Sequence, residues 1–300
     1  MRALLLCIAL STTFLACDKD DDDDSGTSKT ITQIVVDDPD FSVLEAAVVK
    51  AGLTGALSGG TLTVFAPDNS AFAAAGITET TINSLPAPAL DSILKYHVLG
   101  SKVMASGVPA SDTVKTLLGI NVYASNNANG VFVNGIKVKE ADVQASNGVI
   151  HVIEKVLTPP TKTIAQIAAG NPDFSLLVAA VVKAGLLTAV SSPGKYTVFA
   201  PTNAAFNAGG FASVNDINNA PASVVSNVVK YHVLPTAVFA GDLTANAAPA
   251  TLQPGTVTIG LTPSANVKVT GSANVASGIT ATNIIATNGV IHVIDRVLLP

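Results

Sequence analysis

The segment Thr63-Val64-Phe65-Ala66-Pro67-Asp68-Asn69-Ser70-Ala71-Phe72 occurs a second time as Thr197 to Phe206, with changes only at Asp68/Thr202 and Ser70/Ala204. Three flanking segments also recur in the same order. The distance between equivalent positions rises from 133 residues to 141 along the chain, which is too long for a solenoid unit. The chain of 300 residues therefore contains one domain twice, and each copy is long enough to bury its own core. The other recurring segments are 39–53 with 172–186, 95–99 with 230–234, and 147–153 with 288–294.

These repeats divide the chain into four parts. Residues 1–16 are expected to be a signal peptide, and 17–28 an acidic tether. The first domain is expected over 29–159 and the second over 160–300. The junction Thr158-Pro159-Pro160-Thr161 contains two prolines, which predict a short and stiff connector. We therefore expect two domains with limited freedom relative to each other.

The opening segment predicts a tight corner in each copy. Residues 61–66 have the pattern of a buried strand, and Pro67 ends its hydrogen-bonding ladder. Asn69 is predicted to cap a short helix over 70–74 with its side-chain oxygen. Phe65 and Phe72 are the apolar anchors of this corner. The equivalent landmarks of the second copy are Phe199, Pro201, Asn203 and Phe206.

Helices are predicted early in each copy and strands late. Residues 40–51 place Phe41, Leu44, Val48 and Ala51 on one apolar stripe, and 86–96 form a further amphipathic helix. Alternating segments and Asn-Gly turn signals follow from residue 113 onward, and 149–157 is predicted to be a central strand. Each copy is therefore an α+β unit.

Three blocks of each copy resemble the signature blocks and the Tyr-His motif of fasciclin domains. In the first copy they are residues 63–72, 96–97 and 148–153, and the second copy repeats all three. The resemblance covers about residues 29 to 300. It implies two tandem domains, each an antiparallel β-sandwich or wedge packed with several helices, in proteins of extracellular adhesion.

The N-terminus resembles a bacterial lipoprotein signal. Arg2 precedes a short apolar stretch, and Phe14-Leu15-Ala16-Cys17 resembles a lipobox in which Cys17 becomes acylated, although Phe14 replaces the usual Leu. The alternative is an ordinary secretory signal with an incidental cysteine. The only other cysteine, Cys7, lies in the segment that would be removed, so the folded body has no disulfide. Residues 18–24, Lys19 among six Asp, predict a solvated tether and resemble a surface-export signal.

Charge argues against nucleic acid as a partner. The totals of 21 acidic and 16 basic residues become 15 and 14 once the six Asp and Lys19 of the tether and Arg2 of the signal are set aside. A nucleic-acid-binding domain needs a basic face, and a nearly neutral body offers none. The predicted partners are the outer membrane, through the lipid, and a surface protein or polysaccharide.

The four histidines occupy repeat-equivalent positions, which raises the question of a metal or acid–base site. They lack converging cysteine or carboxylate partners in the sequence, so no metal or cofactor is predicted and a structural role is favoured. Tyr96-His97 and Tyr231-His232 remain a candidate interaction motif, since a Tyr-His segment is linked to integrin recognition in animal fasciclin domains. His97 follows a helix C-terminus, where the helix dipole would favour its protonated form. The other two histidines are His151 and His292.

No catalytic motif is present. The chain has no Gly-x-Ser-x-Gly elbow, phosphate-binding loop or Gly-x-Gly-x-x-Gly segment, and no Trp for stacking on sugar rings. The leading hypothesis is a lipid-anchored, non-enzymatic adhesion or matrix-binding protein on the cell surface. Three alternatives stay open: a carbohydrate- or small-ligand-binding lipoprotein, an enzyme, and an envelope protein with a structural role only.

Overall fold

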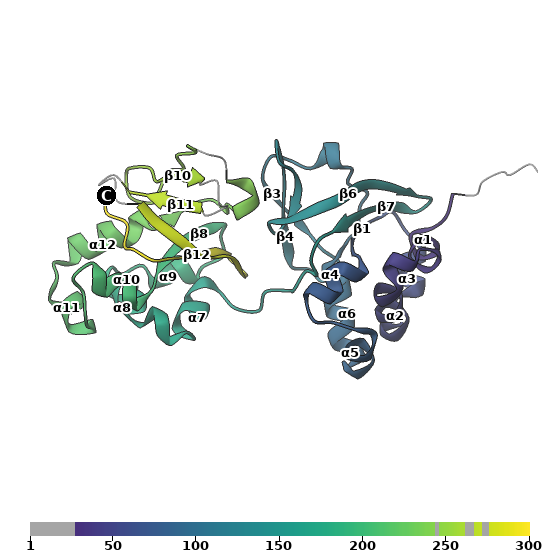
Figure 1. Cartoon of the computed structure of the whole chain (residues 1–300), viewed down its shortest axis with the longest axis horizontal. Coiled ribbons are helices and arrows are strands. Elements are labelled where there is room, and N and C mark those ends of the chain that lie inside the picture. The colour runs from purple at the N-terminus through teal and green to yellow at the C-terminus, as the bar shows by residue number, and fades with distance from the viewer. Residues whose placement is uncertain (1–27, 244–245, 262–266, 272–275) are drawn as a thin grey trace, which may run out of the picture.

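A computed structural model describes residues 28–243, 246–261, 267–271 and 276–300. Cys17 and the Asp-rich tether lie outside these ranges. Two α+β domains lie side by side, and the strands β3 and β4 of the first domain face the second (Figure 1). The α+β class and the tandem arrangement are confirmed.

The first domain begins with helices and ends with strands. Its helical elements are α1 (Ile31–Asp37), a 3-10 turn (Pro39–Phe41), α2 (Ser42–Ala51), α3 (Thr54–Ser58), α4 (Asn69–Ala74), α5 (Glu79–Ser84), α6 (Ala87–Tyr96) and a second 3-10 turn (Ala105–Gly107). Its strands are β1 (Leu62–Pro67), β2 (Val98–Leu99), β3 (Asp112–Lys115), β4 (Asn121–Asn127), β5 (Gly130–Val133), β6 (Ile136–Ala145) and β7 (Gly148–Ile153).

The second domain repeats this order over its described residues. Its helical elements are α7 (Ile164–Ala169), a 3-10 turn (Pro172–Phe174), α8 (Ser175–Lys183), α9 (Leu187–Ser191), α10 (Asn203–Ala208), α11 (Val214–Asn219), α12 (Ala222–Tyr231) and a 3-10 turn (Ala240–Asp242). Its strands are β8 (Tyr196–Pro201), β9 (Val233–Leu234), β10 (Thr258–Leu261), β11 (Val267–Thr270), β12 (Ala276–Ala286) and β13 (Gly289–Ile294).

One strand pair of each sheet differs from the predicted antiparallel arrangement. The first sheet has the order β2-β1-β7-β6-β5-β4-β3, and the second has the order β10-β11-β12-β13-β8-β9. β1 pairs with β7 in parallel, and β8 pairs with β13 in the same way, whereas the other pairs are antiparallel. The parallel pair brings the first strand of a domain against its last, and both strands of the pair are almost wholly buried, as expected for a central position.

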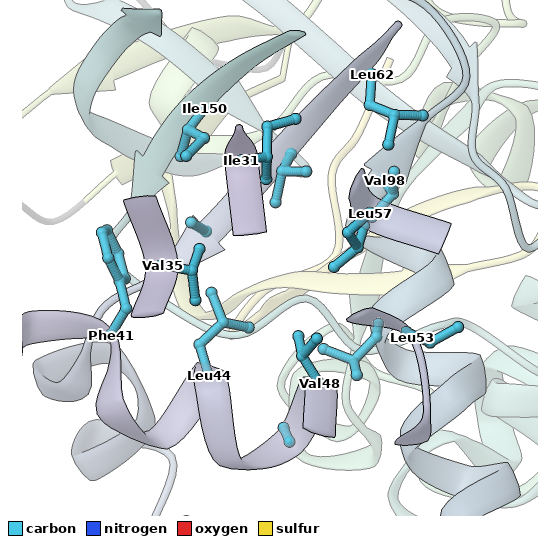
Figure 2. Packing of buried hydrophobic residues seen from close by; sticks show 14 of the residues in the cluster. Ile31, Val35, Phe41, Leu44, Val48, Leu53, Leu57, Leu62, Val98 and Ile150 are labelled. Atoms are coloured by element: carbon cyan, nitrogen blue, oxygen red, sulfur yellow. The ribbon is translucent and has the colours of Figure 1, made fainter. Parts of the chain in front are cut away.

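Apolar side chains from the helices and the sheet converge on one core in the first domain. Figure 2 shows Leu44 and Val48 of α2 facing Ile31 and Val35 of α1, with Ile150 of β7 nearby. The predicted stripe of this helix is confirmed for Phe41, Leu44 and Val48, which are all buried. The helix itself starts at Ser42, because residues 39–41 form a 3-10 turn. The side chain of Asp38 caps that turn by accepting a hydrogen bond from the Asp40 N–H at 2.9 Å.

The turn predicted at Asn134-Gly135 is confirmed. Val133 pairs with Ile136, so these two residues form the whole connection between β5 and β6. Both have positive φ, 50° at Asn134 and 71° at Gly135, as a tight hairpin turn of this kind requires. The final strand is shorter than predicted and ends at Ile153. Leu157 lies beyond the strand, where its N–H donates to His97.

Candidate functional site

The Tyr-His segment of each copy lies inside its domain. Tyr96 is 0% exposed and His97 is 2% exposed. The hydroxyl of Tyr96 donates to the Asn121 carbonyl at 3.3 Å and accepts from the Asn134 amide at 3.0 Å. Burial raises the pKa of Tyr96 to about 12. This side chain therefore fixes the turn after β5 to the end of α6.

His97 joins the end of α6 to the end of the domain. Its Nδ1 lies 2.8 Å from the Ile93 carbonyl, and its Nε2 accepts the Leu157 N–H at 2.9 Å. This arrangement requires a neutral ring with the proton on Nδ1. Burial lowers the pKa of His97 to about 4, although the hydrogen bond to Ile93 raises it slightly. The expectation that the helix dipole favours a protonated His97 is therefore wrong, because desolvation outweighs the dipole.

The second copy repeats this histidine geometry. Tyr231 is 0% exposed and its hydroxyl donates to the Thr256 carbonyl at 2.5 Å. His232 Nδ1 lies 2.7 Å from the Val228 carbonyl, and Nε2 accepts the Leu298 N–H at 2.9 Å. Burial likewise lowers the pKa of His232 to about 4. Recognition of a partner by these four residues stays a prediction, and it would require their exposure from the core.

The other two histidines join the central strands to the neighbouring loops. The ring of His151 stacks on Phe65 with the centroids 5.8 Å apart, and its Nε2 lies 2.8 Å from the Val103 carbonyl. His292 lies 5.8 Å from Phe199 in the same way, with its Nε2 2.8 Å from the Val238 carbonyl. Burial lowers the pKa of His292. Within the described residues, no group of three His, Cys, Asp or Glu side chains converges as a metal site would require.

The corner after β1 is built differently from the prediction. Asp68, not Asn69, caps α4, and its Oδ1 accepts the Ala71 N–H at 2.8 Å. Asn69 instead reaches back to α2, where its Oδ1 accepts the Val43 N–H at 3.1 Å. In the second copy, Thr202 caps α10 and Asn203 accepts the Leu176 N–H at 3.0 Å. The asparagine is therefore the first residue of its helix but not the cap, and its side chain ties that helix to the preceding long helix, α2 or α8.

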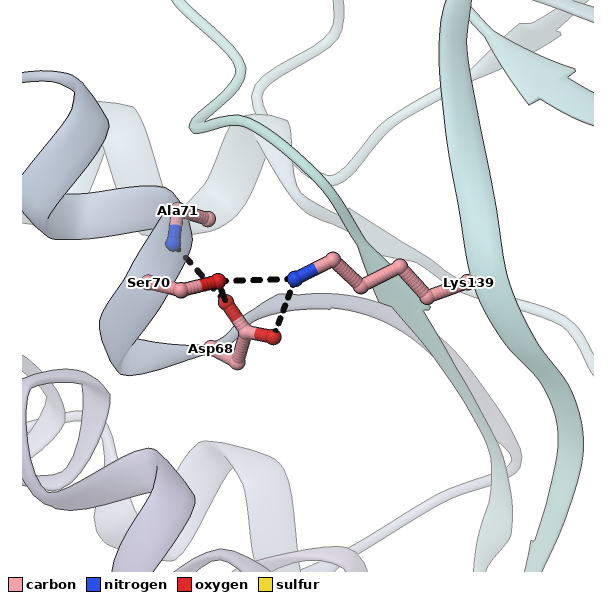
Figure 3. Close-up of polar contacts among 4 residues, drawn as sticks. All are labelled: Asp68, Ser70, Ala71 and Lys139. Atoms are coloured by element: carbon pink, nitrogen blue, oxygen red, sulfur yellow. Dashed lines mark hydrogen bonds and ion pairs between the residues drawn. The ribbon is translucent and has the colours of Figure 1, made fainter.

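A charged bridge occurs at this corner in the first copy. Lys139 Nζ of β6 lies 2.6 Å from Asp68 Oδ2 and 2.7 Å from Ser70 Oγ (Figure 3). Burial raises the pKa of Asp68, but hydrogen bonds from Lys139, Ser70 and Ala71 outweigh burial and hold the pKa below its ordinary value. Thr202 and Ala204 occupy the equivalent positions of the second copy, which carry no carboxylate.

Direct contacts fix the two domains against each other. The rings of Tyr123 and Phe239 lie 5.3 Å apart, and the Ser125 hydroxyl donates to Asp242 Oδ1. Asn127 donates to the same oxygen at 3.3 Å. Burial raises the pKa of Asp242, whereas the hydrogen bonds from Ser125, the Phe239 N–H and Asn127 lower it and leave a net rise. No sequence pattern predicts this interface, because its residues lie in segments that are predicted only as strands or loops.

A cavity lies among the helices of the second domain. It has a volume of about 640 Å³ and lies between α8, α10, α11, α12 and the segment after β13. Its walls are mostly alanine, valine and phenylalanine, and Asp295 and Arg296 line one side. A smaller hollow of about 380 Å³ lies beside the connector between the domains. No helix in the described part of the chain is long and apolar enough to cross a bilayer.

A family model called "Fasciclin domain" matches residues 39–159 and 172–300. The chain belongs to the fasciclin family. This fasciclin protein is 31% identical over 254 residues to transforming growth factor-beta-induced protein ig-h3 of Sus scrofa. The match covers 80% of this chain but 35% of that protein. The chain thus spans about a third of the length of the first curated relatives that it matches.

Two bacterial proteins and one solved structure are also similar to this fasciclin protein. Protein sll1483 of Synechocystis sp. is 42% identical over 137 residues, covering 45% of this chain and 76% of that protein. Immunogenic protein MPT70 of Mycobacterium tuberculosis is 33% identical over 130 residues, covering 41% of this chain and 65% of that protein. A FAS1 domain pair from the insect cell adhesion molecule Fasciclin I has 17% identity and a TM-score of 0.43, covering 90% of this chain and 96% of that chain.

Proposed function

We propose that this chain is a lipid-anchored, non-enzymatic protein of the cell surface that adheres to an extracellular protein or polysaccharide. The observation that carries the proposal is the burial of the family signature. The Tyr and His side chains of both copies make hydrogen bonds inside their own domains, so they serve the framework. Function is then left to the outer surface of the domain pair, as binding requires.

The contacts between the domains support a single binding unit. The Tyr123–Phe239 contact and the hydrogen bonds to Asp242 hold the two domains in one arrangement. A stiff Pro159-Pro160 connector limits the freedom of the pair further. A fixed pair presents a wider continuous surface to a partner than two freely moving domains do. It also loses less conformational freedom when it binds.

The anchor is the second part of the proposal. Cys17 supplies the acylation site, the outer membrane is the proposed location, and residues 18–28 supply the tether to the first domain at the cell surface. A lipidated Cys17 would appear in mass spectrometry of the purified protein as an N-terminal cysteine carrying acyl chains. Cys17→Ser should release the protein from the membrane fraction. An unmodified N-terminus that begins elsewhere would refute the anchor without touching the adhesion proposal.

Adhesion itself is tested with the protein from residue 18 onward, which keeps every described residue. We expect immobilised protein to capture specific surface protein or polysaccharide from envelope and matrix preparations. Cells that lack the gene should attach less and should recover on expression of the wild-type chain. Unchanged attachment, together with no specific capture, would refute the proposal.

The cavity of the second domain favours a second candidate function, small-ligand binding. Its lining bears on the class of ligand. A sugar needs several polar groups and an aromatic platform, whereas this lining is mostly aliphatic, with Phe206 and Phe211 its aromatic side chains. The cavity therefore fits an apolar ligand better than a carbohydrate.

A further inference from the structure

The cavity of the second domain arises where the two copies differ in side-chain size. Helix α6 of the first domain carries Leu90, Ile93 and Leu94, and two of these, Leu90 and Leu94, are fully buried. The equivalent residues of α12 are three valines, and all three line the cavity. Each change removes one methylene or methyl group from the interior while the backbone of the helix is retained. The three valines are Val225, Val228 and Val229.

The mouth of the same cavity is more apolar than the equivalent place in the first copy. Val224 and Leu299 line it and are 50% and 48% exposed. The first copy has Ala89 and Thr158 at these positions. Exposed aliphatic side chains around a hollow cost free energy in water and become favourable when an apolar molecule covers them. Compared with the first copy, the second therefore has smaller side chains on the inner face of α12 and larger apolar side chains at the exposed edge of the cavity.

One side of the cavity carries a positive charge that is available to a ligand. Arg296 lines the cavity and is exposed, and within the described residues its guanidinium makes no hydrogen bond or ion pair, although its backbone N–H donates to Ser277 Oγ. The neighbouring Asp295 also lines the cavity, but its Oδ1 accepts the Ser277 hydroxyl at 3.1 Å and the Gly278 N–H at 2.7 Å. These donors hold the carboxylate toward β12. An anion can therefore bind the guanidinium with less electrostatic repulsion from Asp295.

We propose that this cavity binds a single-chain anionic amphiphile, such as a fatty acid. The hydrocarbon tail lies between α10 and α12, and the carboxylate or phosphate head meets the Arg296 guanidinium. The cavity volume of about 640 Å³ lies within the range of ligand sites, roughly 300–1,000 Å³. A planar guanidinium suits such a head because it donates two parallel hydrogen bonds to carboxylate or phosphate oxygens. This site needs only the second domain and is independent of the adhesion proposal.

The test is calorimetric titration of the protein from residue 18 onward with monomeric dodecanoate. We expect one molecule to bind per chain. Dodecyltrimethylammonium, which has the same tail and the opposite charge, should bind at least about tenfold more weakly because it repels Arg296. Equal affinity for both amphiphiles, or no binding of dodecanoate, would overturn the proposal without recourse to any variant.

Variants then locate the site. Val225→Leu, Val228→Ile and Val229→Leu together restore the side chains of the first copy. They should narrow the cavity along α12 and weaken the binding of dodecanoate at least about tenfold. Arg296→Gln, at an exposed position, should weaken dodecanoate at least about tenfold and leave the cationic amphiphile unweakened. Val182→Leu is the matched control, because Val182 is 56% exposed on α8 and lies outside the cavity. Undiminished binding of dodecanoate in the triple variant would overturn the assignment.

A vesicle experiment separates a free amphiphile from a membrane headgroup as the source of the anion. The same protein is sedimented with vesicles of phosphatidylcholine and phosphatidylglycerol. The proposal predicts binding of monomeric dodecanoate that depends on the three valines. Sedimentation with the vesicles through Arg296, without binding of monomeric dodecanoate, would show a headgroup contact and overturn the cavity assignment.

Discussion

The two domains keep the same internal bonds and differ in what surrounds them. His97 and His232 make equivalent hydrogen bonds, with Nε2 accepting a backbone N–H at 2.9 Å in both. Around this shared framework, the first copy has a charged bridge between Asp68 and Lys139, and the second has an apolar cavity beside α12. The side chains of the repeated Tyr-His motif therefore make bonds inside the fold, and binding is to be sought where the two copies differ.

The largest effect is expected at the glycine that starts the last strand of each domain. A Cβ on Gly148 would lie 2.0 Å from the Leu62 carbonyl oxygen, and one on Gly289 would lie 2.0 Å from the Tyr196 carbonyl oxygen. Gly148→Ala and Gly289→Ala should each cost ~4 kcal/mol or more, because the backbone of a central parallel pair must separate. Calorimetric unfolding measures the loss. Gly59→Ala is the control, since nothing lies within 4 Å of its Cβ. If Gly148→Ala and Gly289→Ala melted at the same temperature as Gly59→Ala, the proposed clash with the backbone of the neighbouring strand would be refuted.

The second effect is acid destabilisation of both domains. His97 and His232 have a folded pKa of about 4, below the ordinary 6.5, so the unfolded chain binds protons more readily between these values. The contribution of each neutral histidine to the free energy of unfolding is complete above pH 6.5 and is lost as the pH falls toward 4. The loss should approach about 3 kcal/mol for each histidine. Urea unfolding from pH 7.5 to pH 4 measures this change.

Glutamine variants provide the matched control for the acid effect. Glutamine does not titrate in this range and can still accept a backbone hydrogen bond. His97→Gln and His232→Gln should therefore lower stability at neutral pH but flatten its dependence on pH between 6.5 and 4. An equally steep pH dependence in the double variant would assign the acid sensitivity to other groups.

A smaller difference is expected between the two corners. Asp68→Ala removes both a helix cap and the bridge to Lys139, whereas Thr202→Ala removes only a cap. We expect a loss of about 2 kcal/mol for the first and about 1 kcal/mol for the second. Lys139→Met removes the bridge and keeps the Asp68 cap, so its loss of stability measures the bridge alone. Equal losses for the two alanine variants would show that the bridge contributes nothing.

The smallest effect is expected at the exposed ion pair between the domains. Lys195 Nζ lies 2.6 Å from Asp112 Oδ1, and both side chains are about half exposed. The hydrogen bond and the charge of Lys195 lower the pKa of Asp112, but solvent screens the pair. Asp112→Asn should leave stability within about 0.5 kcal/mol of the wild type. Tyr123→Ala should loosen the domain pair more, and small-angle scattering would detect a greater spread of domain arrangements. If Asp112→Asn changed stability or the spread of domain arrangements more than Tyr123→Ala does, the ion pair would matter more than the aromatic contact.

The sequence predicted the elements well wherever a pattern is local. The apolar stripe of α2, the two-residue turn at Asn134-Gly135 and the central position of β7 follow from periodicity and turn chemistry. The duplication followed from identity between the copies. The family resemblance is confirmed by a family match that covers both copies.

The failures concern interactions between segments that are distant along the chain. Asn69 is predicted to cap α4, but in the fold its Oδ1 accepts the N–H of Val43 and Asp68 is the cap. His97 follows a helix end, yet the burial that lowers its pKa comes from packing that no local pattern reports. The parallel pairing of β1 with β7 joins the two ends of a domain. The cavity is lined by side chains from four helices and the segment after β13, which come together only in the packed domain.

The central claim is that the repeated Tyr-His residues are internal framework and that binding belongs to the surface around them. Its most direct test is NMR titration of the histidine rings in the protein from residue 18 onward. The account predicts that His97 and His232 stay neutral until the pH approaches 4, with the proton held on Nδ1. Titration of either ring near its ordinary pKa of about 6.5 in the folded protein would contradict the account, because it would place that histidine in contact with solvent.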